Sequence, residues 1–131
     1  FSFTNIITAK EETLLILGDS ISAGYGINQK DNWVSLLQEE FYKEGTSLKL
    51  INSSVSGDTT YGGLNRLNWL LERNNLDIVI LCLGANDMLR GIKPQETKKN
   101  LGKIIQIIQK KKIKLLQIMM KTICLLQNYN V

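Results

Sequence analysis

A chain of 131 residues, 44% of them hydrophobic and 21% charged, is long enough for one globular domain with a packed core. It contains no histidine, no Cys-x-x-Cys pair and no apolar run of membrane-spanning length, which excludes the usual zinc sites and predicts no transmembrane segment. The net charge is +4, and lysines are concentrated after residue 90. No aromatic residue lies among these lysines before Tyr129, and binding of nucleic acid would need such stacking residues. We therefore expect a solvated basic helix face and no nucleic-acid partner.

The first predicted element is a strand over residues 13–19, in which four aliphatic residues lead directly into Gly18-Asp19-Ser20. Such an uninterrupted apolar run is typical of a buried strand in a parallel sheet. Ligands of open α/β sheets bind beyond the carboxyl ends of the strands, so the hydroxyl of Ser20 stands where a nucleophile would act. The alternative is that Asp19 and Ser20 only cap a turn. Residues 1–11 are interpreted as the remnant of a processed leader or as an extension.

Helical and strand patterns alternate along the rest of the chain. Asn32 can cap a helix that begins at Trp33 and stops near Gly45, and Pro94 suits the first position of a later helix. The predicted helices cover residues 33–44, 62–73 and 94–112, and the further predicted strands cover residues 48–52, 77–83 and 113–119. This alternation predicts a single α/β domain over residues 1–131, with a parallel sheet and helices on both of its faces.

Three of the predicted strands end in polar loops, which parallel pairing places at one edge of the sheet. These loops contain Ser20, Gly57 and Asn86. Acyl transfer needs a nucleophile and hydrogen-bond donors directed at the oxyanion that develops on the carbonyl oxygen. The backbone N–H groups of Ser20 and Gly57 and the side-chain amide of Asn86 are suitable donors. The three loops therefore predict an acyl-transfer site.

Three carboxylates, Asp19, Asp58 and Asp87, accompany these groups. Their ordinary pKa near 4 makes them poor bases for a serine hydroxyl, so we expect them to support the loops and to cap helices. The first loop lacks the glycine pattern that cradles phosphates in nucleotide-binding proteins. No metal and no cofactor are therefore predicted.

Three sequence blocks resemble the SGNH or GDSL family of lipases and esterases, in its branch of bacterial arylesterases, lysophospholipases and acyl-CoA thioesterases. The blocks are residues 16–26 (ILGDSISAGYG), residues 52–63 (NSSVSGDTTYGG) and residues 83–91 (LGANDMLRG). The resemblance implies a three-layer α/β/α sandwich of flavodoxin-like type and a small-molecule ester or thioester substrate. It also implies that Ser20 is the nucleophile and that Ser20, Gly57 and Asn86 form the oxyanion hole, with Asp19 and Asp87 in supporting loops.

The sequence departs from the family pattern at one point. The family's fourth element is an Asp-x-x-His block that supplies the general base, and these 131 residues contain no histidine. Three accounts are open: a fragment of a longer enzyme, the product of a gene disrupted near its 3′ end, or a shortened protein kept for another purpose. We expect the chain to be weakly active or inactive. The alternative function is a non-catalytic relic of the same fold that binds an acyl or carbohydrate ligand.

The last predicted strand lacks a neighbour on one side, which would expose backbone groups and apolar side chains along residues 113–119. We therefore expect marginal stability or self-association through this edge of the sheet. The family resemblance and the first residue, which is not methionine, imply export to the periplasm. A cytoplasmic location is the alternative.

Overall fold

Four parallel strands form a single sheet in residues 10–118, the part of the chain that the computed structural model describes. The sheet has the order β2-β1-β3-β4, in which the strands are β1 (Glu12–Gly18), β2 (Leu48–Asn52), β3 (Ile78–Cys82) and β4 (Lys114–Gln117). Leu15 at the centre of β1 pairs with Ile51 on one side and with Val79 on the other. The predicted parallel sheet is confirmed. The predicted leader remnant or extension covers residues 1–11, and the last predicted strand covers residues 113–119. Residues 1–9 of the first and Met119 of the second lie outside the described residues.

The helices that the sequence predicts are present, together with two shorter ones. They are α1 (Ser20–Ala23), α2 (Trp33–Lys43), α3 (Thr60–Arg73), α4 (Ala85–Leu89) and α5 (Pro94–Lys110), and a 3₁₀ turn (Gln29–Asp31) precedes α2. Helix α3 begins two residues earlier than predicted because Thr59 caps it, its Oγ1 accepting a hydrogen bond of 3.2 Å from Gly62 N. The sequence does not predict α1 and α4, because helices of four and five residues are too short to show a 3.6-residue period.

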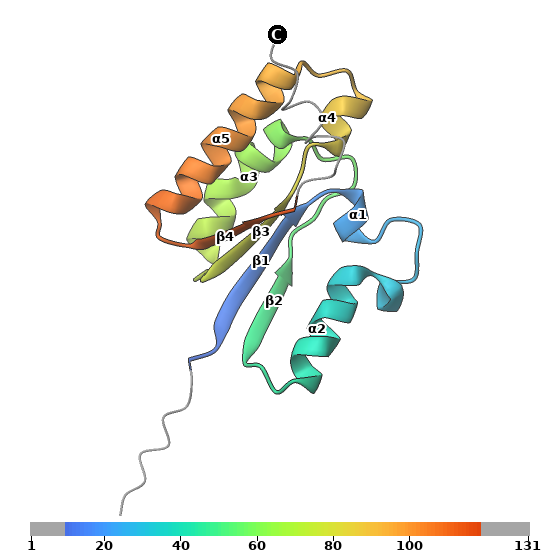
Figure 1. Ribbon diagram of the computed structural model, residues 1–131, viewed down its shortest axis with the longest axis vertical. Coiled ribbons are helices and arrows are strands. Elements are labelled where there is room, and N and C mark those ends of the chain that lie inside the picture. The colour runs from blue at the N-terminus through green and yellow to red at the C-terminus, as the bar shows by residue number, and fades with distance from the viewer. Residues whose placement is uncertain (1–9, 119–131) are drawn as a thin grey trace, which may run out of the picture.

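Helices cover both faces of the sheet, which gives the three layers that the sequence predicts (Figure 1). Helices α3 and α5 lie side by side on one face, where Leu67 and Ile104 pack with Leu15 in the larger of two apolar clusters. Helix α2 lies on the other face, where Val34 packs with Ile16. Successive residues of β1 thus enter opposite cores, as the alternation of side chains along a strand requires. None of the helices in residues 10–118 combines the length and the apolar character needed to cross a membrane.

Strand β4 lies at an edge of the sheet, and β3 is its only strand neighbour within the described residues. Ile113 and Leu115 pack against the larger apolar cluster. In contrast, 58% of Leu116 and 50% of Ile118 are exposed, and neither belongs to the cluster beneath α2. An apolar edge strand of this kind offers unpaired backbone groups to another chain.

We expect Leu116→Lys to weaken self-association of the chain about tenfold, which corresponds to about 1.4 kcal/mol, because the charge would have to be buried when a second chain covers this edge. Sedimentation velocity over a range of protein concentrations measures the association constant. The control is Leu115→Lys on the same strand, which places a charge against the core and should lower the free energy of unfolding instead. A wild-type chain that stays monomeric at every concentration would contradict the expectation.

Candidate active site

Ser20 is the first residue of α1 and lies two residues beyond Gly18, the carboxyl end of β1. Asp19 caps this helix, with its Oδ1 accepting a hydrogen bond of 3.1 Å from Ile21 N. Only 3% of Asp19 is exposed. This burial raises the pKa of the Asp19 carboxyl group, and the hydrogen bond from Ile21 opposes the rise. Gly24, with φ of 75°, ends the helix after one turn, so Ser20 is held in a short capped helix.

The turn after β1 packs against two other segments of the chain. A Cβ atom at Gly18 would lie 2.8 Å from Ser22 Oγ and 2.9 Å from Ser54 Oγ, so a larger residue would force these side chains apart. The carbonyl oxygen of Ser22 accepts hydrogen bonds from the side-chain amides of Asn32, at 2.9 Å, and Asn52, at 2.8 Å. The start of α2 and the end of β2 therefore fix the position of this turn.

The loop between β2 and α3 carries Gly57 in a turn that requires a φ of 78°. Its carbonyl oxygen accepts a hydrogen bond of 2.8 Å from Arg90 Nη2. Among residues 10–118, no acceptor takes up the backbone N–H of Gly57 or that of Ser20. Both N–H groups are therefore available to a ligand at the carboxyl edge of the sheet.

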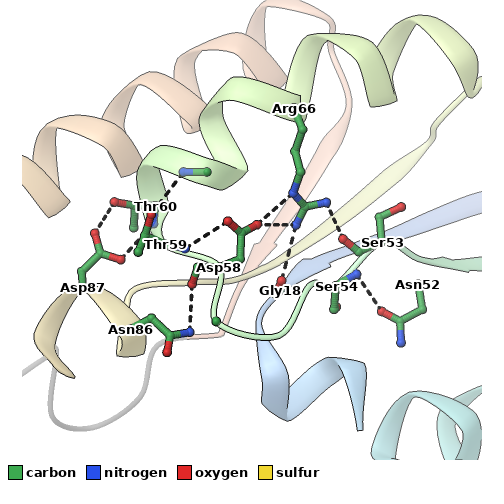
Figure 2. Close-up of polar contacts among 12 residues, drawn as sticks. Gly18, Asn52, Ser53, Ser54, Asp58, Thr59, Thr60, Arg66, Asn86 and Asp87 are labelled. Atoms are coloured by element: carbon green, nitrogen blue, oxygen red, sulfur yellow. Dashed lines mark hydrogen bonds and ion pairs between the residues drawn. The ribbon is translucent and has the colours of Figure 1, made fainter. Parts of the chain in front are cut away.

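Asn86 lies in α4, directly beyond the carboxyl end of β3. Its Nδ2 donates a hydrogen bond of 2.9 Å to the carbonyl oxygen of Asp58, which joins the loops that follow β2 and β3 (Figure 2). A primary amide carries two N–H bonds, so one remains for another acceptor. The predicted meeting of the Gly57 and Asn86 loops is confirmed.

Asp87 is fully buried and accepts hydrogen bonds from two helices. Its carboxylate accepts from the backbone N–H of Thr60 at 2.9 Å, from the Thr60 hydroxyl and from the Thr97 hydroxyl at 3.2 Å. Asn100 Nδ2 in turn donates to Thr60 Oγ1 at 3.1 Å. The network ties α4, which carries the neighbouring Asn86, to the amino-terminal ends of α3 and α5. Asp87 thus contacts both helices beside the site, and its role in supporting the loops stays a prediction.

Arg66 of α3 binds three acceptor groups, which lie in two segments of the site, through one guanidinium group (Figure 2). Its Nε and Nη2 contact Asp58 Oδ2 at 2.9 and 2.8 Å, Nη1 donates to the carbonyl oxygen of Ser53, and Nη2 lies 3.4 Å from the carbonyl oxygen of Gly18. The Arg66 and Asp58 side chains are 23% and 11% exposed, so the pair is largely shielded from solvent. The turn after β1 and the loop after β2 thus share one cation. The sequence shows Arg66 only as a polar residue in a predicted helix.

A pocket of about 270 Å³ opens beside the turn after β1, between α1, the start of α2 and the end of β3. Its wall is mostly apolar and consists of Asp19, Ile21, Ser22, Trp33, Cys82, Leu83, Ala85 and Ile118. Burial raises the pKa of the Cys82 thiol, so this group remains protonated at neutral pH. The sequence does not indicate this pocket, because its wall combines residues from four separate segments of the chain. No group of three metal-ligating side chains occurs in the described part of the chain.

Comparison with known proteins identifies relatives of one kind. A family model described as GDSL-like lipase/acylhydrolase matches residues 16–130. The chain is 47% identical over 98 residues to an arylesterase of Vibrio mimicus, covering 75% of this chain and 49% of the relative. It is 40% identical over 112 residues to a protein of Escherichia coli named as a thioesterase, protease and lysophospholipase, covering 83% of this chain and 52% of the relative.

Solved structures agree with this result. The crystal structure of TesA superposes with a TM-score of 0.78 at 42% identity, and the match covers 81% of this chain and 59% of that one. The psychrotrophic esterase EstA from Pseudoalteromonas, inhibited by monoethylphosphonate, gives a TM-score of 0.77 at 40% identity, over 81% and 58% of the two chains. The present chain spans about half the length of the curated relatives it matches.

We expect Arg66→Met to lower the free energy of unfolding by about 2–4 kcal/mol, because it removes charge-assisted hydrogen bonds and leaves the Asp58 carboxylate without its cation. Urea denaturation followed by circular dichroism measures the loss. The matched control is Arg73→Met on the same helix, where the exposed guanidinium lies 4.8 Å from the ring of Trp69 and a change within about 0.5 kcal/mol is expected. Equal losses in both variants would show that Arg66 does not hold the loops together.

Proposed function

The chain belongs to the GDSL-like lipase/acylhydrolase family, and on that premise we propose that it supplies the nucleophile and the oxyanion hole of an ester or thioester hydrolase. One observation carries the proposal. The loops that hold Ser20, Gly57 and Asn86 meet at the carboxyl edge of the sheet, joined by the contacts of Arg66 and by the hydrogen bond from Asn86 to Asp58. Ser20 is the nucleophile in this proposal.

In the proposed reaction, Ser20 Oγ attacks the carbonyl carbon of the acyl group while a general base takes the hydroxyl proton. The carbonyl oxygen becomes an oxyanion that accepts hydrogen bonds from the N–H groups of Ser20 and Gly57 and from the free amide N–H of Asn86. The intermediate then expels the alcohol or thiol, which receives the proton from the base. Water attacks the resulting acyl-serine by the same route and releases the carboxylic acid.

The base is the component that these residues do not supply. The 131 residues contain no histidine. The three nearby carboxylates already accept other hydrogen bonds or form an ion pair. Asp19 caps α1, Asp58 pairs with Arg66, and Asp87 accepts hydrogen bonds from Thr60 and Thr97. Without an imidazole the serine hydroxyl stays protonated, so we propose that this chain alone retains no more than the residual acceleration of about 10³–10⁴ that an oxyanion hole and binding provide.

The apolar pocket beside α1 suits the acyl group of the substrate. Ile21 and Ala85 in its wall are sequence neighbours of Ser20 and Asn86, so an acyl chain in the pocket would hold its carbonyl carbon near the nucleophile. The pocket has a volume of about 270 Å³, so we propose that it takes a short or medium acyl chain.

We expect added imidazole to raise the rate of p-nitrophenyl acetate hydrolysis by this chain, because free imidazole can act as the base that the chain lacks. The increase should be at least about tenfold above the same imidazole with Ser20→Ala, which removes only the nucleophile. Stopped spectrophotometric assays of released p-nitrophenolate measure both rates. Identical imidazole dependence in the two proteins would contradict the role proposed for Ser20 and would favour a non-catalytic relic that binds its ligand.

The oxyanion hole has a separate test. Asn86→Ala should lower the Ser20-dependent rate by about 10²–10³, the usual cost of one oxyanion donor. Because this change also removes the hydrogen bond to Asp58, urea denaturation must show that the variant is folded under the assay conditions. Asn68→Ala, an exposed asparagine on α3, is the matched control and should leave the rate unchanged. An Asn86→Ala variant that is folded and retains the full rate would rule out the amide as a donor.

A further inference from the structure

The outward side of α5 is rich in lysine. Lys99, Lys103 and Lys110 are separated by four and seven residues, and a helix with 3.6 residues per turn places such positions on one side. All three residues are exposed. The residues that α5 buries lie on the opposite side and are Thr97, Leu101, Ile104 and Ile108. Helix α5 therefore presents a row of cations to solvent.

A second pocket, with a volume of about 440 Å³, extends this row of lysines to α3 and to the segment after α4. Lys99 and Lys103 line it together with Arg90 and with Tyr61 of α3. Tyr61 is 62% exposed, and Leu89, which precedes Arg90, is 82% exposed. One aromatic and one aliphatic side chain thus lie in solvent next to cations. We call six residues together the basic face: Tyr61, Leu89, Arg90, Lys99, Lys103 and Lys110.

The basic face carries charge that the rest of the described chain does not neutralise. Within residues 10–118, none of its four cations forms an ion pair, and Glu96 is the only carboxylate that lines the second pocket. Residues 90–118 contain nine lysine or arginine residues and one acidic residue. On the opposite face of the sheet, where α2 lies, residues 31–44 contain four acidic residues and one lysine (Figure 1). The molecule is therefore polarised, with its positive side on α5.

We propose that the basic face docks on the surface of an anionic lipid bilayer. Clusters of about four to eight lysine and arginine residues on an amphipathic helix are attracted to such surfaces, and each cation adds to the attraction. Tyrosine suits the headgroup level of a bilayer, and a leucine side chain gains free energy when it enters the acyl region. A nucleic-acid partner is matched less well, because the second pocket offers a single aromatic side chain for stacking. The acidic side at α2 then faces away from the bilayer.

Docking in this orientation brings the candidate active site to the lipid surface. Helix α3 follows β2, and α5 follows β3 and α4, so the amino-terminal ends of both helices lie at the carboxyl edge of the sheet. The second pocket lies at these ends. Arg90 in its wall donates a hydrogen bond of 2.8 Å from Nη2 to the carbonyl oxygen of Gly57, in the loop of the proposed oxyanion hole. The docking itself requires no acyl transfer, so it stands apart from the proposed function.

Flotation of the chain with lipid vesicles measures the docking directly. We expect the chain to float with vesicles of about 30% phosphatidylglycerol in phosphatidylcholine and to stay free with phosphatidylcholine alone, and the bound fraction should fall as salt is added. Lys99→Gln/Lys103→Gln should weaken the binding by at least about tenfold, because each lysine near an anionic surface contributes about fivefold. Leu89→Ser should weaken it by about threefold, because an aliphatic group no longer enters the lipid.

The matched control is Lys30→Gln/Lys43→Gln, which removes the same charge from α2 and the turn before it and should change the binding less than about twofold. Equal weakening in both double variants would show a general charge effect and overturn the proposal. Equal flotation with both kinds of vesicle, or flotation with neither, would also overturn it. Tighter binding to an oligonucleotide than to anionic vesicles at equal phosphate concentration would assign the basic face to nucleic acid instead.

Two further measurements separate docking from catalysis. Ser20→Ala should float as wild type does, because the basic face lies outside the turn that holds the nucleophile. Loss of flotation in Ser20→Ala would show that lipid is held at the candidate active site, and it would overturn the docking. Lys99→Gln/Lys103→Gln should keep the imidazole-dependent hydrolysis of p-nitrophenyl acetate, so failure of the catalytic proposal is read separately.

Discussion

The guanidinium group of Arg66 is the contact on which the arrangement of the site depends. It projects from α3 between the turn after β1 and the loop after β2, and it binds the Asp58 carboxylate together with the backbone oxygens of Ser53 and Gly18. A charge that is largely removed from water must be paired and hydrogen-bonded to be tolerated, and the loops that surround Arg66 supply these acceptors. The cation in turn prevents the two loops from moving independently. The parallel sheet brings three loops to one edge, but Arg66 determines how two of them meet.

Other buried polar groups around Arg66 are also hydrogen-bonded, and their contacts reach from Asp58 to α4. The backbone carbonyl of Asp58 accepts a hydrogen bond from the Asn86 amide. Asp87, the next residue, binds α4 to α3 and α5. In electrostatic catalysis the donors must already point to where negative charge develops, because donors that reorient during the reaction lose much of their benefit. Buried polar groups that are fully hydrogen-bonded provide such rigidity. The site is therefore built to hold donors in place, which is consistent with a function in acyl transfer.

The sequence predicts the strands and the longer helices well because their signals are local. The apolar run before Gly18 indicates a buried strand, Asn32 caps α2 as expected, and Pro94 begins α5. Contacts between distant segments carry no comparable local signal. Neither the convergence of two asparagine amides on the Ser22 carbonyl nor the position of Arg66 between three oxygens follows from periodicity or spacing. Similarly, the lysines at 99 and 103 resemble a solvated helix face, and only the packing of α5 against α3 shows that they border a pocket.

Strand β4 lies at the edge of the sheet, so it can open locally while the central strands β1 and β3 stay paired. Strands β1 and β3, which lead into Ser20 and Asn86, are each hydrogen-bonded to strands on both sides, whereas β4 is bonded within the described residues to β3 alone. Amide hydrogens of an edge strand exchange with solvent through small fluctuations, whereas those of central strands require larger unfolding events. Opening of β4 would displace Ile118 from the wall of the apolar pocket, whereas the loops that hold Ser20, Gly57 and Asn86 follow other strands. Access to the apolar pocket and the geometry of the proposed oxyanion hole are thus expected to respond to different local openings of the fold.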